Sequence, residues 1–297
     1  MSTITSGSSS GPGTTAPWKP LFLSHLSKMP SPEFVLTSLH PSSSAKEKTP
    51  PGPNPAGPGP VAYVPRARYC IYRGMWAELP ENKHNTAPRN PEGIYESALP
   101  TLTSDARMEK VPEVFATSAG KGEPDQATGS GGGGPVEAVF WVKEVMTQWR
   151  VRGEAFVVAP DIEDGDGESS GVRTVKSEIG QRMQLKSGDE KDWSWGTELT
   201  AHFGNLSPGM RGSFKNPPPG TPVSVPTAPD QSLGQKINDL HDPLARQNFR
   251  VMIIRPDEVE QLDLSDPAKA RRWRFTYIGE GEQDGKIGDW KKEELWP

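Results

Sequence analysis

The stretch VEAVFWVKEVMTQWRVRGEAFVVA, residues 136–159, indicates the fold more clearly than any other part of the sequence. Within it, apolar Trp149 and Val151 alternate with polar Gln148 and Arg150. That period of two is typical of a strand with one apolar and one polar face. Shorter β-like runs occur at 33–39, 63–74, 95–104, 248–254 and 272–278.

Helical patterns are fewer than strand patterns. Residues 17–29 place apolar side chains at helical spacing and predict an amphipathic helix over the core. Residues 192–205 fit a helix capped by an acid, and Ser207-Pro208 is a plausible start for a short helix. Because the strands do not alternate regularly with helices, we predict an α+β fold with an antiparallel barrel or sheet.

Glycine and proline, 31 and 32 of the 297 residues, are concentrated in stretches with little to bury. Such segments cannot offset the entropy lost on ordering, so we predict that they do not pack. They are residues 1–16, 41–60, 118–135, 160–171 and 215–232. We therefore expect a disordered tail at 1–16 and one domain at 17–297 with insertions. The glycine tract 129–134 is interpreted as flexible linker, because it lacks the context of a phosphate-binding loop.

Several functional classes lack support in the sequence. A net charge of −5 argues against a generic nucleic-acid binder, and a single cysteine, Cys70, excludes an intramolecular disulfide and thiolate zinc sites. The histidines share no metal-ligand spacing, and no GxSxG elbow is present. No apolar run approaches the roughly 20 residues that a bilayer helix requires. We therefore expect a cytoplasmic protein without a metal.

Cationic and hydroxyl side chains gather on and after two predicted strands. Arg68 and Arg73 bracket the apolar stretch 69–72, while Thr103, Ser104, Arg107 and Lys110 lie in and just after the next strand. Guanidinium, ammonium and hydroxyl groups could converge on a phosphate. The same residues on the solvated face of a sheet would need no ligand, and their spacing alone favours that simpler interpretation.

Four motifs, read in order, carry a family resemblance. They are RYCIYR at 68–73, LTSDARMEK at 102–110, TQWRVRG at 147–153, and RFTY at 274–277 followed by Trp290 and a terminal LWP. Together they resemble the pyridoxamine 5′-phosphate oxidase superfamily of FMN-binding split β-barrels, specifically its Alr4036-type branch in a fungal-like form with insertions. The APWK at 16–19, the PPPG at 217–220 and residues 255–267 fit that branch too.

The resemblance implies an FMN cofactor held between the two subunits of a homodimer. Arg68 and Lys110 would bind the FMN phosphate, and Arg73 would lie near the polar edge of the flavin. Gln148 would hydrogen-bond the isoalloxazine, and Arg274 would approach it from the C-terminal strand. The implied cofactor-binding residues are Arg68, Tyr69, Cys70, Arg73, Thr103, Ser104, Arg107, Lys110, Gln148 and Arg274.

The departures from the family pattern concern the substrate more than the cofactor. Leu262 stands where the oxidases carry a tryptophan, and Ala270 and Arg272 occupy the positions of their substrate-gripping Arg-x-His. In the phosphate segment Met108-Glu109 replaces Ser-Arg, so Arg107 would have to compensate for the added negative charge.

Two functional hypotheses follow. The first is an FMN-dependent oxidoreductase of unknown substrate. The alternative is a non-catalytic flavin- or ligand-binding dimeric module whose proline-rich loops, near 50–60 and 217–229, serve protein partners.

Overall fold

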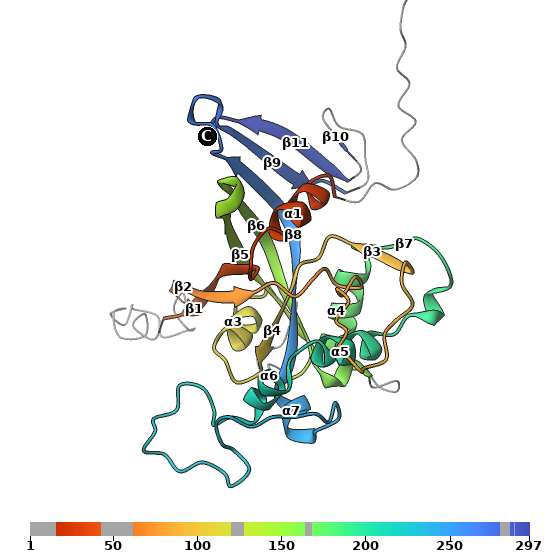
Figure 1. Ribbon diagram of the computed structural model, residues 1–297, viewed down its shortest axis with the longest axis vertical. Coiled ribbons are helices and arrows are strands. Elements are labelled where there is room, and N and C mark those ends of the chain that lie inside the picture. The colour runs from red at the N-terminus through yellow and green to blue at the C-terminus, as the bar shows by residue number, and fades with distance from the viewer. Residues whose placement is uncertain (1–15, 43–61, 120–127, 164–167, 280–285, 288) are drawn as a thin grey trace, which may run out of the picture.

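A nine-stranded antiparallel sheet forms the centre of the computed structural model, which describes residues 16–42, 62–119, 128–163, 168–279, 286–287 and 289–297 (Figure 1). Its strands are β1 (Glu33–Pro41), β2 (Tyr63–Ile71), β4 (Thr101–Asp105), β5 (Gly131–Val142), β6 (Thr147–Val158), β8 (Phe249–Asp263), β9 (Arg271–Tyr277), β10 (Lys286–Ile287) and β11 (Trp290–Leu295). The order is β10-β11-β9-β8-β6-β5-β1-β2, and β4 pairs with β8. Among the described strands, the end strands β10 and β2 do not pair with each other, so the sheet is open.

The stretch 136–159, a single β-like run in the sequence, forms most of the hairpin β5–β6; its alternation predicts β6 but not the turn. Val142 lies opposite Thr147 at the closed end, and the turn contains Met146 in the left-handed conformation at φ 47°. Strand β6 pairs on its other side with β8 over nearly its whole length.

Strand β8 connects the two ends of the molecule. Near its start Val251 lies opposite Thr103 of β4, and near its end Glu260 lies opposite Arg274 of β9. Figure 1 shows β8 running from α6 and α7 at the bottom to the β9–β11 ribbon at the top. Because each extended residue advances the chain by about 3.3 Å, these two positions are separated by roughly 30 Å of strand.

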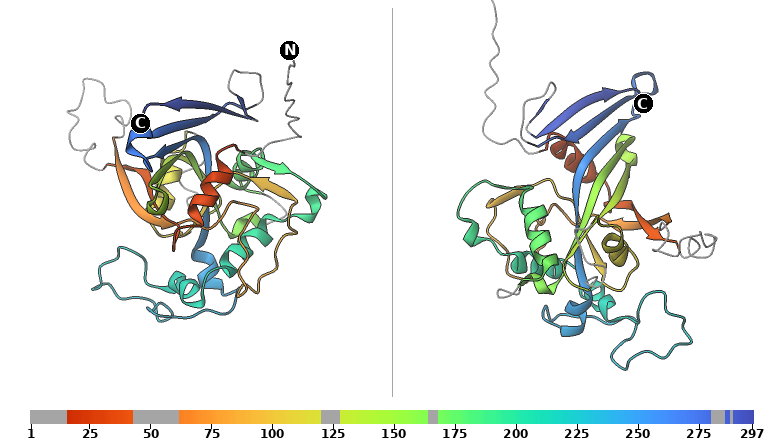
Figure 2. Two further views of the ribbon diagram at one scale, coloured as in Figure 1. Left: turned by 45° about the horizontal axis from the view of Figure 1, so that its top comes forward. Right: turned by 180° about the vertical axis from the view of Figure 1, so that it is seen from behind.

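The predicted N-terminal helix covers one side of the core. Helix α1 (Lys19–Leu26) buries Phe22, whose ring meets Phe140 of β5 edge-on at 5.1 Å and Trp149 of β6 at 5.5 Å between centroids. Such edge-to-face contacts add to the stabilisation that burial of the rings provides. Figure 2 shows α1 lying between the hairpin and the C-terminal ribbon.

The other helices pack against β1, β5, β6 and β8 of the sheet or, for the last two, against the 3₁₀ turn Ser213–Lys215. They are α3 (Lys110–Ala116), α4 (Ser170–Gly180), α5 (Trp195–Gly204), α6 (Pro208–Gly212) and α7 (Pro243–Asn248). The cap of α5 is Ser194 and not the acid expected from the sequence, since Asp192 ends a separate 3₁₀ turn. The cap of α6 is Ser207, as predicted. None of the described helices is long and apolar enough to cross a membrane.

The β-like run 95–104 forms two strands and not one. Strand β3 (Tyr95–Ser97) pairs with β7 (Met183–Leu185) in a small second sheet, while β4 belongs to the main sheet. Pro100 lies between them, and proline cannot donate to a strand ladder.

The interpretation of 129–134 as flexible linker is wrong. Gly131–Gly134 are buried within β5, and Gly132 has a φ of +96°. A Cβ at Gly134 would lie 2.2 Å from Oγ1 of Thr117 and 2.6 Å from the carbonyl oxygen of Val114. These glycines therefore allow α3 to approach the sheet backbone closely, a role that composition alone does not reveal.

The other stretches predicted not to pack have mixed outcomes. In 160–171, Asp161 is tied to the chain just before β5, because its carboxylate accepts the amide of Ser130 at 3.0 Å. Residues 216–242 contain neither helix nor strand. Residues 1–15, 43–61, 120–127 and 164–167 lie outside the described part of the chain, so the predictions for them are untested.

Candidate functional site

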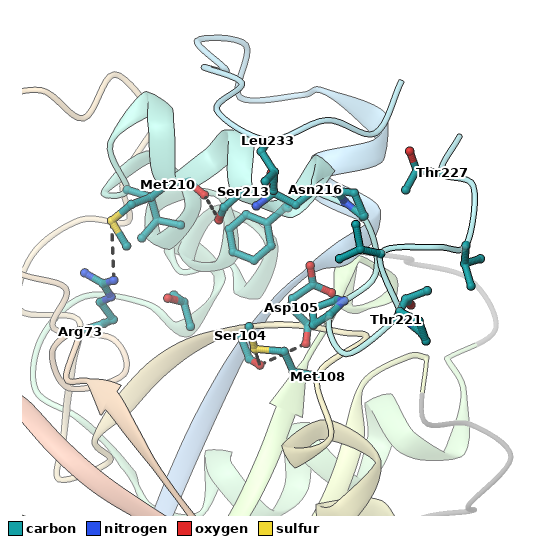
Figure 3. Close-up of a pocket in the computed structure, with 18 residues that line it drawn as sticks. Arg73, Ser104, Asp105, Met108, Met210, Ser213, Asn216, Thr221, Thr227 and Leu233 are labelled. Atoms are coloured by element: carbon teal, nitrogen blue, oxygen red, sulfur yellow. Dashed lines mark hydrogen bonds between the residues drawn. The ribbon is translucent and has the colours of Figure 1, made fainter. Parts of the chain in front are cut away.

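A cavity of about 570 Å³ lies between the end of β4, helix α6 and the loop 216–233, which we call the strap. Figure 3 shows Arg73 on one side of this cavity, Ser104 and Met108 beneath it, and Thr227 and Leu233 of the strap opposite. Its volume lies within the range typical of small-molecule sites. The sheet therefore supplies one wall, and a chain segment without regular structure supplies the other.

Lys110 lies directly behind the sheet-side wall. It is the first residue of α3 and is only 8% exposed. Its Nζ donates to the Ser104 hydroxyl at 3.0 Å and lies 2.9 Å from the Met108 sulfur. No carboxylate among the described residues forms an ion pair with it. Burial lowers the pKa of Lys110. The fold thus holds a desolvated ammonium behind two residues that line the cavity.

Arg73 is a second cation without a carboxylate partner in the described structure. It follows β2, and its guanidinium lies 3.9 Å from the sulfur of Met210. Its buried Nε has no hydrogen-bond partner among the described residues. Burial also lowers the pKa of Arg73. Because buried donors are normally paired, this guanidinium is a candidate for binding an acceptor on a ligand.

Arg68 is engaged within the protein. Its guanidinium forms an ion pair with Glu113 at 2.8 Å and also contacts the hydroxyl of Ser38. Glu113 is 2% exposed and accepts a further contact from Nδ1 of His40 at 3.0 Å. Next to Arg68 on β2, Cys70 is buried, and burial raises the pKa of its thiol against the opposing fields of Lys110 and Arg68. Arg68 and Lys110 are therefore neighbours, but Arg68 already has a counter-ion.

Arg107 anchors the strap. It forms an ion pair with Asp105 at 2.7 Å and donates to the carbonyl oxygens of Phe214 and Asn216 at 3.2 and 3.0 Å. A guanidinium held by these partners is not available to offset the charge of Glu109, which is exposed at the start of α3. For Arg107 to bind a phosphate, its ion pair with Asp105 would have to break.

Gln148 and Arg274 lie away from the cavity in the same chain. They lie opposite Leu262 and Glu260 of β8, at the far end of that strand from Ser104. Arg274 is paired with Glu293 at 2.8 Å. Tyr69 is 80% exposed on the edge strand β2. One chain therefore brings together only part of the predicted set, namely Arg68, Cys70, Arg73, Thr103, Ser104 and Lys110.

The strap and Glu113 are the parts of the site that sequence reasoning did not find. The strap is rich in proline, which suggested a spacer, although Val223 and Val225 in it were a signal for an apolar surface. Glu113 lies on a helix that no pattern predicted, and its pairing with Arg68 depends on tertiary structure.

Comparisons with known proteins agree with this architecture. Residues 15–159 match the family model described as pyridoxamine 5′-phosphate oxidase, FMN-binding domain. No curated protein matches the sequence. A solved structure of a pyridoxamine 5′-phosphate oxidase-related, FMN-binding protein from Nostoc punctiforme PCC 73102 is 16% identical, with a TM-score of 0.51 over 96% of this chain and 100% of that chain. At this identity the likeness shows the fold, and it confirms the expected antiparallel split-barrel class.

Two other solved structures are less similar. PhzG from Burkholderia lata 383, in complex with tetrahydrophenazine-1-carboxylic acid, is 14% identical with a TM-score of 0.35, over 94% of this chain and 89% of that one. General Stress Protein 26 from Bacillus anthracis str. Sterne is 9% identical with a TM-score of 0.29, over 81% and 92% of the two chains.

Proposed function

We propose that this protein, whose residues 15–159 belong to the pyridoxamine 5′-phosphate oxidase FMN-binding domain family, is an FMN-dependent oxidoreductase that holds the cofactor phosphate at Lys110. The observation that carries the proposal is the buried ammonium of Lys110, which has a hydroxyl and a thioether as its close partners and no ion-paired carboxylate in the described structure. Burying an ammonium without a counter-ion is unfavourable. A phosphate at Ser104 would supply the missing charge.

The other residues around the cavity have complementary roles in this proposal. The Ser104 and Thr103 hydroxyls would complete the phosphate shell, while Arg73 would donate to a polar edge of the cofactor. Arg68, neutralised by Glu113, would contribute less than Lys110. FMN, when bound, supplies electron transfer, and the protein supplies orientation and charge.

A homodimer is part of the proposal. Gln148 and Arg274 are separated from Ser104 by roughly 30–40 Å of strand β8, so one chain does not bring all the predicted flavin ligands to one place. A second subunit could present its own Gln148 and Arg274 to this cavity. Light scattering on the FMN-loaded protein measures its oligomeric state directly. A monomer that binds FMN tightly would contradict the proposed homodimer.

The substrate is inferred to differ from pyridoxamine 5′-phosphate. Arg272, which occupies one position of the family's substrate-gripping motif, is paired with Glu260 at 2.6 Å. Ala270 and Leu262 cannot clamp a phosphate or a ring as the family's arginine and tryptophan would. Since rate depends on positioning within about an ångström, turnover of pyridoxamine 5′-phosphate should be far below the usual enzyme range of about 1 s⁻¹.

The experiment begins with the absorption spectrum and the cofactor released on denaturation. We expect FMN and not FAD, and we expect Lys110→Met to weaken FMN binding by about 1.5–3 kcal/mol, the scale of a hydrogen bond to a charged group. The matched control is Lys143→Met, because Lys143 is exposed at the turn of the β5–β6 hairpin. Equal affinities for the Lys110→Met variant and the parent would contradict the phosphate assignment.

Catalysis is tested separately from binding. The FMN-loaded protein is mixed with reduced nicotinamide donors, and flavin bleaching and reoxidation by air are followed by absorbance. Repeated turnover supports an oxidoreductase. A flavin that binds but cannot be reduced by any donor supports the non-catalytic module instead.

A further inference from the structure

The mouth of the cavity carries an unusual share of exposed apolar side chains. Five of the large hydrophobic residues that the described structure exposes to solvent line this single cavity: Met108, Met210, Val223, Val225 and Leu233. Leu233 is 78% exposed and Val223 is fully exposed. An exposed apolar patch around a concave site marks a place where apolar surface is covered on binding.

The strap side of the cavity has no charge with which to bind an anion. Residues 217–229, PPPGTPVSVPTAP, contain no charged side chain. The charged residues that line the described cavity are Arg73 and Asp105, both on the sheet side, and Asp105 is neutralised by Arg107. Thr221 and Thr227 add only neutral hydroxyls. A phosphate or carboxylate placed against this wall would be desolvated without a counter-ion.

Both ends of the strap are attached to the domain. At its start Phe214 and Asn216 accept from Arg107, and Asn248 also donates to Phe214 at 2.8 Å. Beyond its end, the backbone of Ile237 bonds to α6 through Pro208 at 2.9 Å and Arg211 at 2.8 Å.

Prolines stiffen the segment between these attachments. They recur at positions 217, 218, 219, 222, 226 and 229. Because proline reduces the freedom of the unbound chain, less entropy is lost when the segment closes on a ligand.

We infer that the strap is the substrate-binding wall of this site, and that it selects an uncharged apolar molecule, such as a small aromatic ring system, over a phosphorylated one. The inference rests on the proposed function, because the Lys110 end of the same cavity is then occupied by the FMN phosphate. The Met108 and Met210 side chains suit such a ligand, since thioethers adapt to different apolar shapes.

The test uses a matched pair of probes on the FMN-loaded protein, 1-naphthol and 1-naphthyl phosphate. We expect 1-naphthol to bind saturably and at least tenfold more tightly than 1-naphthyl phosphate, measured by calorimetry. On protein saturated with FMN, Val225→Asp and Leu233→Asp should each weaken 1-naphthol binding at least fivefold. The control is Leu185→Asp, because Leu185 is similarly exposed but lies on β7, outside the cavity lining.

A further variant reverses the preference. Val225→Arg places a cation on the uncharged wall and should tighten 1-naphthyl phosphate binding severalfold. The inference is overturned if 1-naphthol does not bind saturably below millimolar concentration, or if the two aspartate variants bind it as the parent does. Failure of the proposed function is a separate result, because FMN binding is measured first, by its spectrum, on the same preparations.

Discussion

The guanidinium of Arg68 lies 2.8 Å from a carboxylate oxygen of Glu113, a residue of α3 that is 2% exposed. Both residues flank Lys110, whose pKa is influenced by the field of each. The pair removes the net charge of Arg68 from the region where the family resemblance places a phosphate. Lys110 is therefore the cation that the described protein leaves without a carboxylate partner at this point.

The Glu113→Gln variant tests this pair. We expect the free energy of unfolding to fall by about 1–3 kcal/mol, because the neutral amide cannot pair with the partly buried Arg68. FMN binding should become severalfold tighter, since a negative charge near Lys110 is removed. Urea unfolding and FMN titration measure the two effects, with exposed Glu144→Gln as the control. Weaker FMN binding would show instead that Glu113 positions Arg68 on the phosphate.

The Lys110→Met variant should separate stability from cofactor binding. Without FMN, we expect its free energy of unfolding at neutral pH to equal or exceed that of the parent, because an apolar side chain of similar length replaces a buried charge. Burial lowers the pKa of Lys110 in the folded protein below its ordinary 10.5. At a pH between the lowered pKa and 10.5, the folded protein therefore binds fewer protons than the unfolded chain. Stability of the parent therefore rises with pH through that window.

This alkaline rise should disappear in Lys110→Met. Chemical unfolding at several pH values up to 10.5 measures it, and Lys143→Met serves as the exposed control. A large loss of stability in Lys110→Met at neutral pH would mean that the ammonium is satisfied within the apo protein and is not held for a ligand.

The strands of the main sheet could be predicted because their signal is local. Alternation around Trp149 and Val151 identifies β6, and the neighbouring runs identify β1, β2 and β9 within a few residues. The run 248–254 identifies only the first half of β8, which continues to Asp263. The order of the strands is not a local property, and the fold class came from the absence of regular βαβ alternation. FMN and its candidate ligands were predicted from the resemblance to the family's motifs. The assignment to the Alr4036-type branch of that family stays a prediction.

The errors have a common physical cause, which is that composition does not report packing distance. The glycine tract in β5 has the composition of a linker, but the close approach of Thr117 and Val114 leaves no room for a side chain there. The strap has the composition of a spacer, and only its tertiary attachment through Arg107 makes it a cavity wall. The pairing of Arg68 with Glu113 likewise joins two residues that are 45 positions apart in the sequence.

The glycine tract yields a direct stability prediction. Gly134→Ala should lower the free energy of unfolding by about 2 kcal/mol or more, because its Cβ would overlap Thr117 and the α3 backbone. Gly180→Ala is the matched control: a Cβ there meets nothing within 4 Å, and the position is helical. Alanine is favoured over glycine in a helix, so this variant should be stabilised by up to about 1 kcal/mol. Similar thermal unfolding curves for both variants would show that α3 does not pack as closely as the structure has it.

The pH dependence of stability should be dominated in the acid range by a buried histidine. His202 of α5 is 1% exposed and stacks on Trp76 with ring centroids 5.5 Å apart. Its ring nitrogens have no hydrogen-bond partner among the described residues. Burial, aided by the fields of Arg73 and Arg89, lowers the pKa of His202 to about 3. The imidazole is therefore neutral in the folded protein at neutral pH.

Proton binding by His202 decides whether stability rises or falls with pH. The unfolded chain protonates His202 near pH 6.5, whereas the folded protein does so only near pH 3, so stability falls as the pH drops from 6.5 toward 3. Each pH unit in this window lowers the free energy of unfolding by up to about 1.4 kcal/mol. Between pH 7 and pH 4.5 the loss caused by His202 is about 2.5 kcal/mol. The nearby carboxyl of Glu198 has the opposite sign, because burial raises its pKa and acid then favours the folded state.

His202→Phe isolates this contribution. Phenylalanine can keep the stacking on Trp76 but does not titrate, so between pH 7 and pH 4.5 the parent should lose about 2.5 kcal/mol more of its unfolding free energy than the variant does. His84→Phe is the control, because His84 is exposed and its replacement should leave the pH profile unchanged. The measurement is urea unfolding at half-unit intervals of pH, followed by tryptophan fluorescence. Parallel profiles for parent and His202→Phe would mean that the folded protein protonates His202 as readily as the unfolded chain does, and the site beneath Trp76 would then have to admit water.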